Sequence, residues 1–127
     1  MSKVRRPVGW IGSAKKDFID FPEPVQAEMG YALYLAQLGS KGDKAKPLKG
    51  FSGIGVLEII EDYIGDTYRT VYTVRFDEAV YVLHAFQKKS KRGIATPQTD
   101  VNLIKERLKR AEQYHLEWIK TRGADYE

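Results

Sequence analysis

Three segments between residues 56 and 88 have the composition of β-strands and are separated by two very short turn signals. The segments are Val56–Ile64, Thr67–Phe76 and Ala79–Lys88, and they are rich in β-branched and aromatic residues. Gly65-Asp66 and Asp77-Glu78 lie between them as two-residue turns. Because such short turns join antiparallel neighbours, the pattern predicts a three-stranded meander whose apolar face must be covered by other elements.

The two turns also predict a register for the meander. The turn at residues 77–78 places Phe76 opposite Ala79, and the turn at residues 65–66 places Asp62 opposite Arg69. We call the face that carries Arg69, His84 and Lys88 the working face. Its expected members are Asp62, Arg69, Val71, Thr73, Arg75, Val82, His84, Phe86 and Lys88. The opposite face is expected to seat two helices, because it is almost wholly apolar and aromatic: Leu57, Ile59, Tyr63, Tyr68, Tyr72, Val74, Phe76, Tyr81 and Leu83.

Helical patterns lie on both sides of the meander in the sequence. Residues 8–11 are a strand candidate, Ser13 can cap a short helix that ends near Phe21, and residues 25–36 repeat apolar side chains at helical spacing. Residues 40–55 are expected to form a loop. Thr96 and Pro97 can begin a last helix, in which His115 belongs to the apolar stripe as a packing residue. The sequence therefore predicts one α+β domain over residues 1–127, with two helices on an antiparallel meander and a further C-terminal helix.

Positive charge is concentrated in two segments of the chain. Residues 88–110 carry eight Lys or Arg against two acidic residues, and residues 40–50 carry four lysines against one aspartate. Since the whole chain has a net charge of +4, the remainder is acidic, and the two segments favour an anionic partner. The alternative is a solvated helix face plus a solubilising loop. The chain has no cysteine, no apolar run long enough to span a membrane and no leader-like start, which favours a cytoplasmic protein.

Several motifs of this chain resemble the RelE/ParE superfamily of toxins, specifically its HigB-type, phage-derived branch. These motifs are Y-R-x-x-Y (68–72), L-H-x-F-x-K-K (83–89), K-R-G (91–93) and P-L-K-G (47–50). The resemblance covers residues 8 to about 111 and implies a RelE-like fold, in which a helical pair packs on a curved antiparallel sheet. It also implies a type II toxin that cleaves mRNA on the ribosome and is held inactive by a cognate helix-turn-helix antitoxin.

The resemblance assigns site residues by position. Arg69 corresponds to the sheet arginine that contacts the scissile phosphate, Lys88 and Lys89 to basic residues at the end of the last strand, and Lys91 and Arg92 to their basic continuation. The expected catalytic set is Arg69, His84, Lys88, Lys91 and Arg92, and the expected RNA-binding set is Lys89, Lys46 and Lys49. The chain departs from the family at Ile60, where an arginine often completes an E-L-R pattern.

Each of these assignments has a structural alternative. Arg69 can instead form a cross-strand ion pair with Asp62, or be oriented by it. His84 can be a general acid or base, because its reference pKa is near neutral, or a structural histidine. Lys46 and Lys49 can belong to a solvated loop instead of contacting ribosomal RNA.

The expected chemistry is metal-independent attack by the RNA 2′-OH, with cations that stabilise the phosphorane and no cofactor. No histidine or carboxylate pair has the spacing of a metal site. Two other functions remain open: a ParE-like binder that poisons DNA gyrase, and a degenerate phage protein that retains only antitoxin binding. Arg69, His84 and the cations after it favour the nuclease, whereas Ile60 keeps the degenerate reading open.

Overall fold

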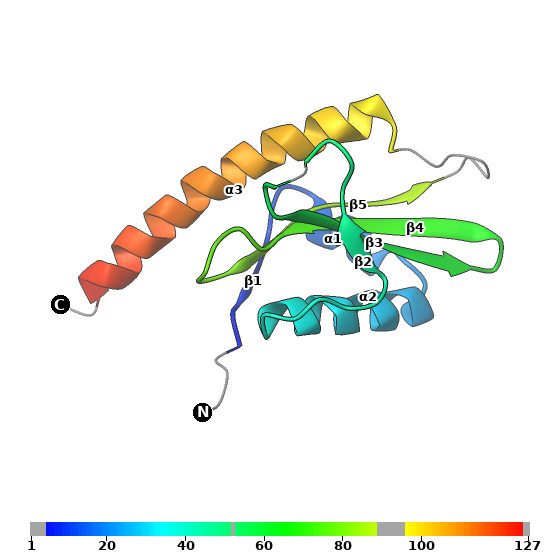
Figure 1. Ribbon diagram of the computed structural model, residues 1–127, viewed down its shortest axis with the longest axis horizontal. Coiled ribbons are helices and arrows are strands. Elements are labelled where there is room, and N and C mark those ends of the chain that lie inside the picture. The colour runs from blue at the N-terminus through cyan, green and yellow to red at the C-terminus, as the bar shows by residue number, and fades with distance from the viewer. Residues whose placement is uncertain (1–4, 52, 89–95, 126–127) are drawn as a thin grey trace.

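The computed structural model describes residues 5–51, 53–88 and 96–125, with side chains described up to residue 121 (Figure 1). In chain order the elements are β1 (Val8–Trp10), α1 (Ala14–Ile19), α2 (Glu23–Gln37), β2 (Ala45–Pro47), β3 (Val56–Tyr63), β4 (Asp66–Thr73), β5 (Val80–Lys88) and α3 (Gln98–Asp125). The predicted α+β class, the meander and the C-terminal helix are all confirmed.

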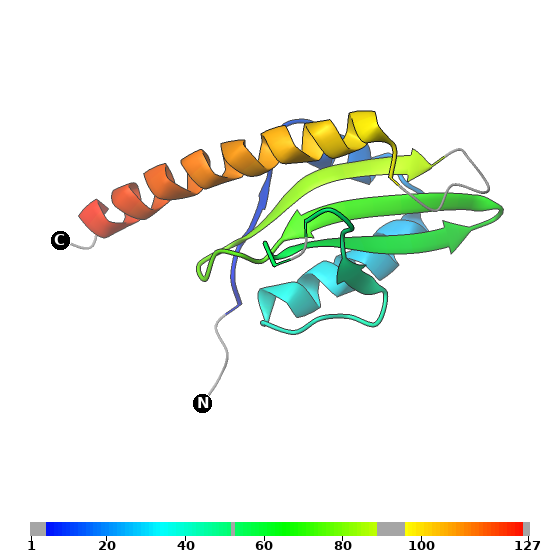
Figure 2. The ribbon, with the colours of Figure 1, turned by 45° about the horizontal axis from the view of Figure 1, so that its top comes forward.

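The sheet has five strands in the order β1-β5-β4-β3-β2, and helices cover both of its faces (Figure 2). α1 and α2 pack on one face and α3 packs on the other. The sheet is mixed, because β1 pairs with β5 in parallel while the meander and β2 are antiparallel. β2 lies within the segment that was predicted to be a loop. Pro47 is compatible with its position at the sheet edge, where one row of backbone groups needs no strand partner.

The hairpin between β3 and β4 differs from its predicted register by two residues. Its turn is formed by Ile64 and Gly65, with φ of 48° and 80°, instead of by Gly65 and Asp66. Two consecutive positive φ angles give the turn twist that matches the flanking strands. A two-residue shift leaves every side chain on its predicted face but changes its neighbours, so Arg69 lies opposite Ile60 instead of Asp62.

A β-bulge interrupts the pairing of β4 with β5. The register runs as predicted from Thr67–Lys88 to Val71–His84, and then shifts by one residue so that Tyr72 pairs with Val82. The strands are connected by residues 74–79 and not by the predicted two-residue turn at 77–78.

The bulge reverses the side-chain directions that simple alternation predicted for the start of β5. Tyr81 and Leu83 pack against α3, together with Phe76 from the preceding segment, although all three were assigned to the opposite face. Val82, which was assigned to the working face, packs toward α1 and α2.

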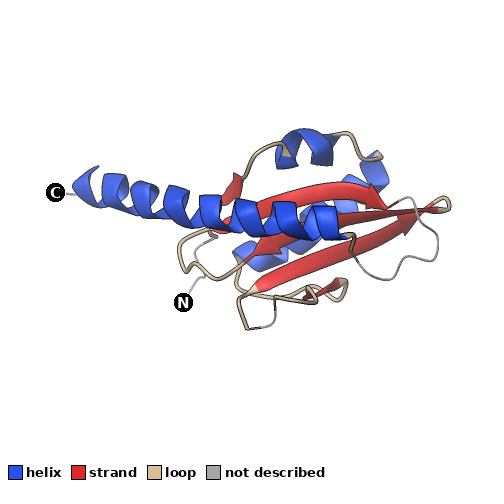
Figure 3. Cartoon of the chain, turned by 90° about the horizontal axis from the view of Figure 1, so that it is seen from above, coloured by secondary structure: helices blue, strands red, loops and turns tan. Residues whose placement is uncertain are grey.

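α3 is the longest element, with 28 residues and hence a length of about 42 Å. Its first half lies across the sheet and its second half extends past the strands (Figure 3). The predicted apolar stripe faces the sheet, since Ile104, Leu108, Ala111 and His115 are buried.

Candidate functional site

Arg69, His84 and Lys88 lie close together on the working face, beneath the beginning of α3. Phe86 of β5 pairs with Arg69 of β4, and His84 and Lys88 are two residues before and after Phe86. Because every second residue of a strand shares a face, the three polar side chains point the same way. The grouping predicted from the alternation pattern is confirmed for these residues.

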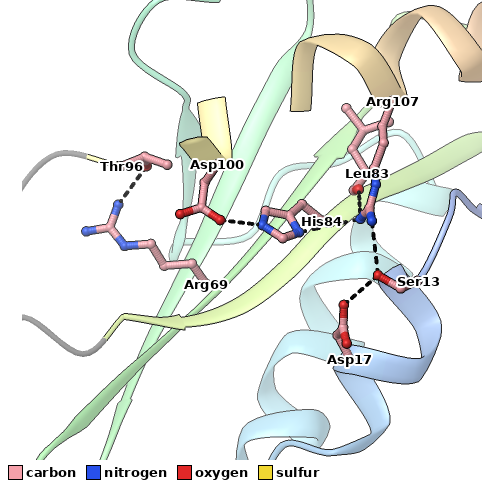
Figure 4. A network of polar contacts seen from close by, with 8 residues as sticks. All are labelled: Ser13, Asp17, Arg69, Leu83, His84, Thr96, Asp100 and Arg107. Atoms are coloured by element: carbon pink, nitrogen blue, oxygen red, sulfur yellow. Dashed lines mark hydrogen bonds and ion pairs between the residues drawn. The ribbon is translucent and has the colours of Figure 1, made fainter. Parts of the chain in front are cut away.

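Arg69 is buried and forms an ion pair with Glu58 of β3. Its Nη1 donates to Glu58 Oε2 at 3.0 Å and to Thr96 Oγ1, just before α3, at 3.3 Å (Figure 4 shows the contact with Thr96). The predicted pair with Asp62 is wrong, because the two-residue register shift places Asp62 opposite Thr67 instead of Arg69. Asp62 instead accepts a hydrogen bond from the Thr67 hydroxyl at 2.7 Å.

His84 has hydrogen-bond partners at both ring nitrogens, and both partners come from α3. Its Nε2 lies 2.7 Å from Asp100 Oδ1, and its Nδ1 lies 3.5 Å from Nη1 of Arg107. A carboxylate can only accept and a guanidinium can only donate, so Nε2 carries the proton and Nδ1 is the acceptor. The ring also stacks on Phe86, with centroids 4.7 Å apart.

Arg107 connects three elements of the fold. Besides His84, its guanidinium donates to the Leu83 carbonyl at 2.9 Å and to Ser13 Oγ at 3.0 Å (Figure 4). The Ser13 hydroxyl in turn donates to Asp17 Oδ2 at 2.8 Å, so it does not cap α1 as predicted. This chain of contacts fixes the first half of α3 against β5 and α1.

Lys88 is buried beside Arg69, and its environment disfavours the ammonium form. Burial lowers the pKa of Lys88 and the nearby charge of Arg69 lowers it further, whereas the carboxylates of Glu58 and Asp100 act in the opposite direction. A lysine whose pKa is lowered and which lies beside an arginine is typical of sites that bind or transform anionic groups.

The other expected site residues fall into two groups. Lys89, Lys91 and Arg92 lie outside the described residues. Lys46 and Lys49 are exposed. Lys46 pairs with Glu58 in the register of β2 and β3, and its neighbour Ala45 packs on the α2 side, so the Lys46 side chain is on the working face.

Sequence reasoning missed the acidic and basic partners of the three central residues. Glu58, Asp100 and Arg107 were not assigned a role, yet each contacts Arg69 or His84. A signal was present for two of them, since positions 100, 104, 107, 108 and 111 share one side of a helix. A charged residue on that apolar side needs a buried partner.

His115 was predicted to pack and is buried as expected, but it is also hydrogen-bonded. Its Nδ1 accepts from the Tyr81 hydroxyl at 2.7 Å, and its Nε2 lies 2.8 Å from Glu78 Oε1. Burial raises the pKa of Tyr81 to about 12, with smaller contributions from Tyr114 and Glu78, so the hydroxyl remains a donor. The histidine ring packs among Phe76, Tyr81 and Trp118, edge-to-face with Tyr81 and tilted against the other two.

Two further findings concern the described part of the chain. No group of three or more His, Asp or Glu side chains in residues 5–51, 53–88 and 96–125 is arranged to hold a metal ion. No helix in the same ranges is both long and apolar enough to cross a membrane.

Comparison with known proteins identifies the family. Residues 16–109 match the family described as "Phage derived protein Gp49-like (DUF891)". The chain therefore belongs to the Gp49-like family of phage-derived proteins, which confirms the resemblance to the phage-derived branch that the motifs indicated.

The chain is also similar to a solved structure, the toxin-antitoxin complex RelBE2 from Mycobacterium tuberculosis. The identity is 20%, the similarity covers 70% of this chain and 98% of the other, and the TM-score is 0.43. No curated protein sequence matches the chain.

Proposed function

We propose that this protein is the toxin of a type II toxin-antitoxin system and acts as a ribosome-dependent mRNA endonuclease. The observation that carries the proposal is the pairing of Arg69 with Lys88 on one sheet face. Two cations held side by side cost free energy, which a folded protein recovers when an anion binds between them. Membership in a phage-derived family and the Y-R-x-x-Y and L-H-x-F-x-K-K motifs support an RNA phosphate as that anion.

The proposed reaction is attack of the RNA 2′-OH on the adjacent phosphate, without a metal ion. Arg69 would hold two phosphate oxygens through its guanidinium fork, and Glu58 would keep that fork oriented. Lys88 would stabilise the phosphorane, and its lowered pKa suits the donation of a proton to the leaving 5′-oxygen. As the bond from O2′ to phosphorus forms, the O2′ proton passes to water, and the P–O5′ bond breaks while Lys88 protonates the leaving oxygen. The products are a 2′,3′-cyclic phosphate and a free 5′-hydroxyl, and Lys88 regains its proton from water.

His84 is assigned a conditional role in this mechanism. Both of its ring nitrogens are occupied by Asp100 and Arg107, so it has no nitrogen available for proton transfer while α3 is in place. It becomes a general acid or base only when Asp100 moves away. Lys91 and Arg92 complete the proposed catalytic set.

The proposed partners are the ribosome with its mRNA and a cognate helix-turn-helix antitoxin, and the proposed location is the cytoplasm. Lys46 is exposed on the working face and Lys49 is exposed three residues later, which supports contact of both cations with RNA phosphates. Together with Lys89 they form the proposed RNA-binding set.

A second function is favoured by one observation, the deep burial of Arg69 and Lys88. A protein that binds DNA gyrase or only an antitoxin would not need these cations to reach a phosphate. Ile60, which lies opposite Arg69 in place of the family's arginine, is consistent with a site that has lost its chemistry.

The experiment is induction of the protein alone, with mRNA half-lives, protein synthesis and the SOS response followed over the same minutes. Nuclease activity predicts that mRNA decay and arrested translation come first. SOS induction with continuing protein synthesis would instead indicate gyrase poisoning. Arg69→Lys serves as the matched variant, because a lysine can still pair with Glu58 but cannot grip phosphate bidentately, so toxicity should fall while the fold is kept.

A further inference from the structure

The proposed chemistry requires Arg69 and Lys88 to touch a phosphate, but the structure leaves almost none of their surface accessible. Arg69 is 5% exposed and Lys88 is 7% exposed, and His84 between them is 6% exposed. Residues 96–107 lie over this part of the working face (Figure 4). A phosphate group of an RNA backbone could not reach Arg69 and Lys88 in this arrangement.

The residues that lie over the site are held by polar contacts. Thr96 accepts from Arg69 at 3.3 Å, and Asp100 accepts from His84 at 2.7 Å. Arg107 is the last residue of the segment that lies over the site. Its guanidinium donates to the Leu83 carbonyl and faces His84 Nδ1. The charge of Asp100 also acts on Lys88, so this carboxylate lies near the cationic surface that the proposed function assigns to a phosphate.

The beginning of α3 is packed more weakly than the central part of the helix, which crosses the sheet. Residues 97–103 are exposed or half-buried without exception, and Ile104 is the first fully buried residue of the helix. From Ile104 onward, Leu108 and Ala111 anchor α3 in the core on this side of the sheet. Segments with few buried apolar contacts open at lower free energy than the rest of a fold, so the first two turns can lift while the remainder stays docked.

We propose that residues 97–103 are an internal cover of the working face, held closed by the chain of contacts Asp100–His84–Arg107. In the closed state the cover holds a carboxylate of the protein itself, that of Asp100, beside the anion site. When it lifts, Arg69 and Lys88 become accessible and His84 Nε2 loses its partner. The inference rests on the proposed function for its biological meaning, but the movement and the exposure of Lys88 can be measured without it.

The first test loosens the cover without changing any charge near Lys88. Thr99→Gly with Asn102→Gly lowers helix propensity at two exposed positions and should raise the open population about threefold. The matched control is Gln113→Gly with Leu116→Gly, at exposed positions of α3 beyond the site. The readout is the acetylation rate of Lys88 by an activated acetate ester, measured by mass spectrometry against the rate at exposed Lys46.

The cover predicts slow acetylation of Lys88 in the wild type and in the control pair, and about threefold faster acetylation in the Thr99/Asn102 variant. Lys46 should react equally in all three proteins. If Lys88 reacts as fast as Lys46 in the wild type, or if loosening leaves its rate unchanged, there is no cover and the inference fails.

The second test removes the carboxylate that closes the cover. Asp100→Asn should speed amide hydrogen exchange about tenfold in residues 98–103 and leave residues 108–121 unchanged. Uniform exchange across α3 in the wild type and the variant would contradict a cover that lifts separately. Growth arrest on induction is then compared between the wild type and Asp100→Asn. If residues 98–103 open and Lys88 becomes reactive, the cover is confirmed. If, in that case, neither the wild type nor the variant affects mRNA or growth, the proposed nuclease function fails.

Discussion

Replacement of Glu58 by Gln tests the buried ion pair on which the arrangement of Arg69 depends. The two side chains are 7% and 6% exposed and lie 3.0 Å apart, so the substitution leaves a buried guanidinium without its countercharge. Removing one partner of such a pair costs ~3–5 kcal/mol, and we expect about 3 kcal/mol because glutamine keeps an oxygen that accepts a hydrogen bond. With an unfolding entropy of about 2.1 cal/mol/K for each of 127 residues, the melting temperature should fall by about 11 °C.

Thermal and urea unfolding followed by circular dichroism at neutral pH measures this effect. The matched control is Glu112→Gln, which breaks the exposed pair of Glu112 with Arg75 and should cost less than about 1 kcal/mol. The double variant Glu58→Leu with Arg69→Met should recover most of the lost stability, because a buried pair is replaceable by apolar side chains of similar size. If the free energy of unfolding of Glu58→Gln is within about 0.5 kcal/mol of the wild-type value, the pair does not hold Arg69 in place.

Three further predictions concern stability and chemistry. Lys88→Met should raise the free energy of unfolding while abolishing toxicity, and exposed Lys46→Met is the control for stability alone. The folded state disfavours the Lys88 ammonium, so the gain in stability is complete below the folded-state pKa and disappears as pH rises to the unfolded value of 10.5. A melting temperature that falls would contradict it. Gly12→Ala should destabilise the fold by more than about 1 kcal/mol, because φ is +59° and the new Cβ would lie 2.9 Å from Arg107 Nε. Gly30→Ala within α2 has open space and should stabilise the fold by about 0.5–1 kcal/mol. Equal effects of the two substitutions in chemical denaturation would refute this contrast. RNA cleavage should survive chelation by EDTA, with the magnesium requirement of the ribosome controlled, and fail on a substrate whose scissile nucleotide is 2′-deoxy; the opposite pattern would rule out attack by the 2′-OH.

The grouping of Arg69, His84 and Lys88 could be predicted from sequence because it depends on alternation along β4 and β5 and on their register from Thr67–Lys88 to Val71–His84, which is as predicted. The turn between β3 and β4 was misplaced, but the resulting error was two residues, and an even shift preserves faces. The partner of Arg69 could not be predicted in the same way, because neighbours depend on the absolute register. That register is set by the backbone angles of Ile64 and Gly65.

The start of β5 shows a different limit of sequence reasoning. The β-bulge adds one unpaired residue, and an odd shift reverses every face beyond it, which is why Tyr81 and Leu83 lie under α3. Nothing in the local composition marks the bulge, since all residues from Val80 to Leu83 are suited to a strand. The roles of Asp100 and Arg107 depend on how α3 docks, which is a tertiary property.

The parallel pairing of β1 with β5 sets an expected order of folding. β3, β4 and β5 are neighbours in sequence and can pair through short connections, whereas Val8 meets Val80 only after a loop of more than half the chain has closed. Loop closure of that length is entropically unfavourable and slow compared with hairpin formation. The first strand to leave the ribosome is therefore expected to be the last to join the sheet, and a chain that stops before β5 leaves β1 without a partner.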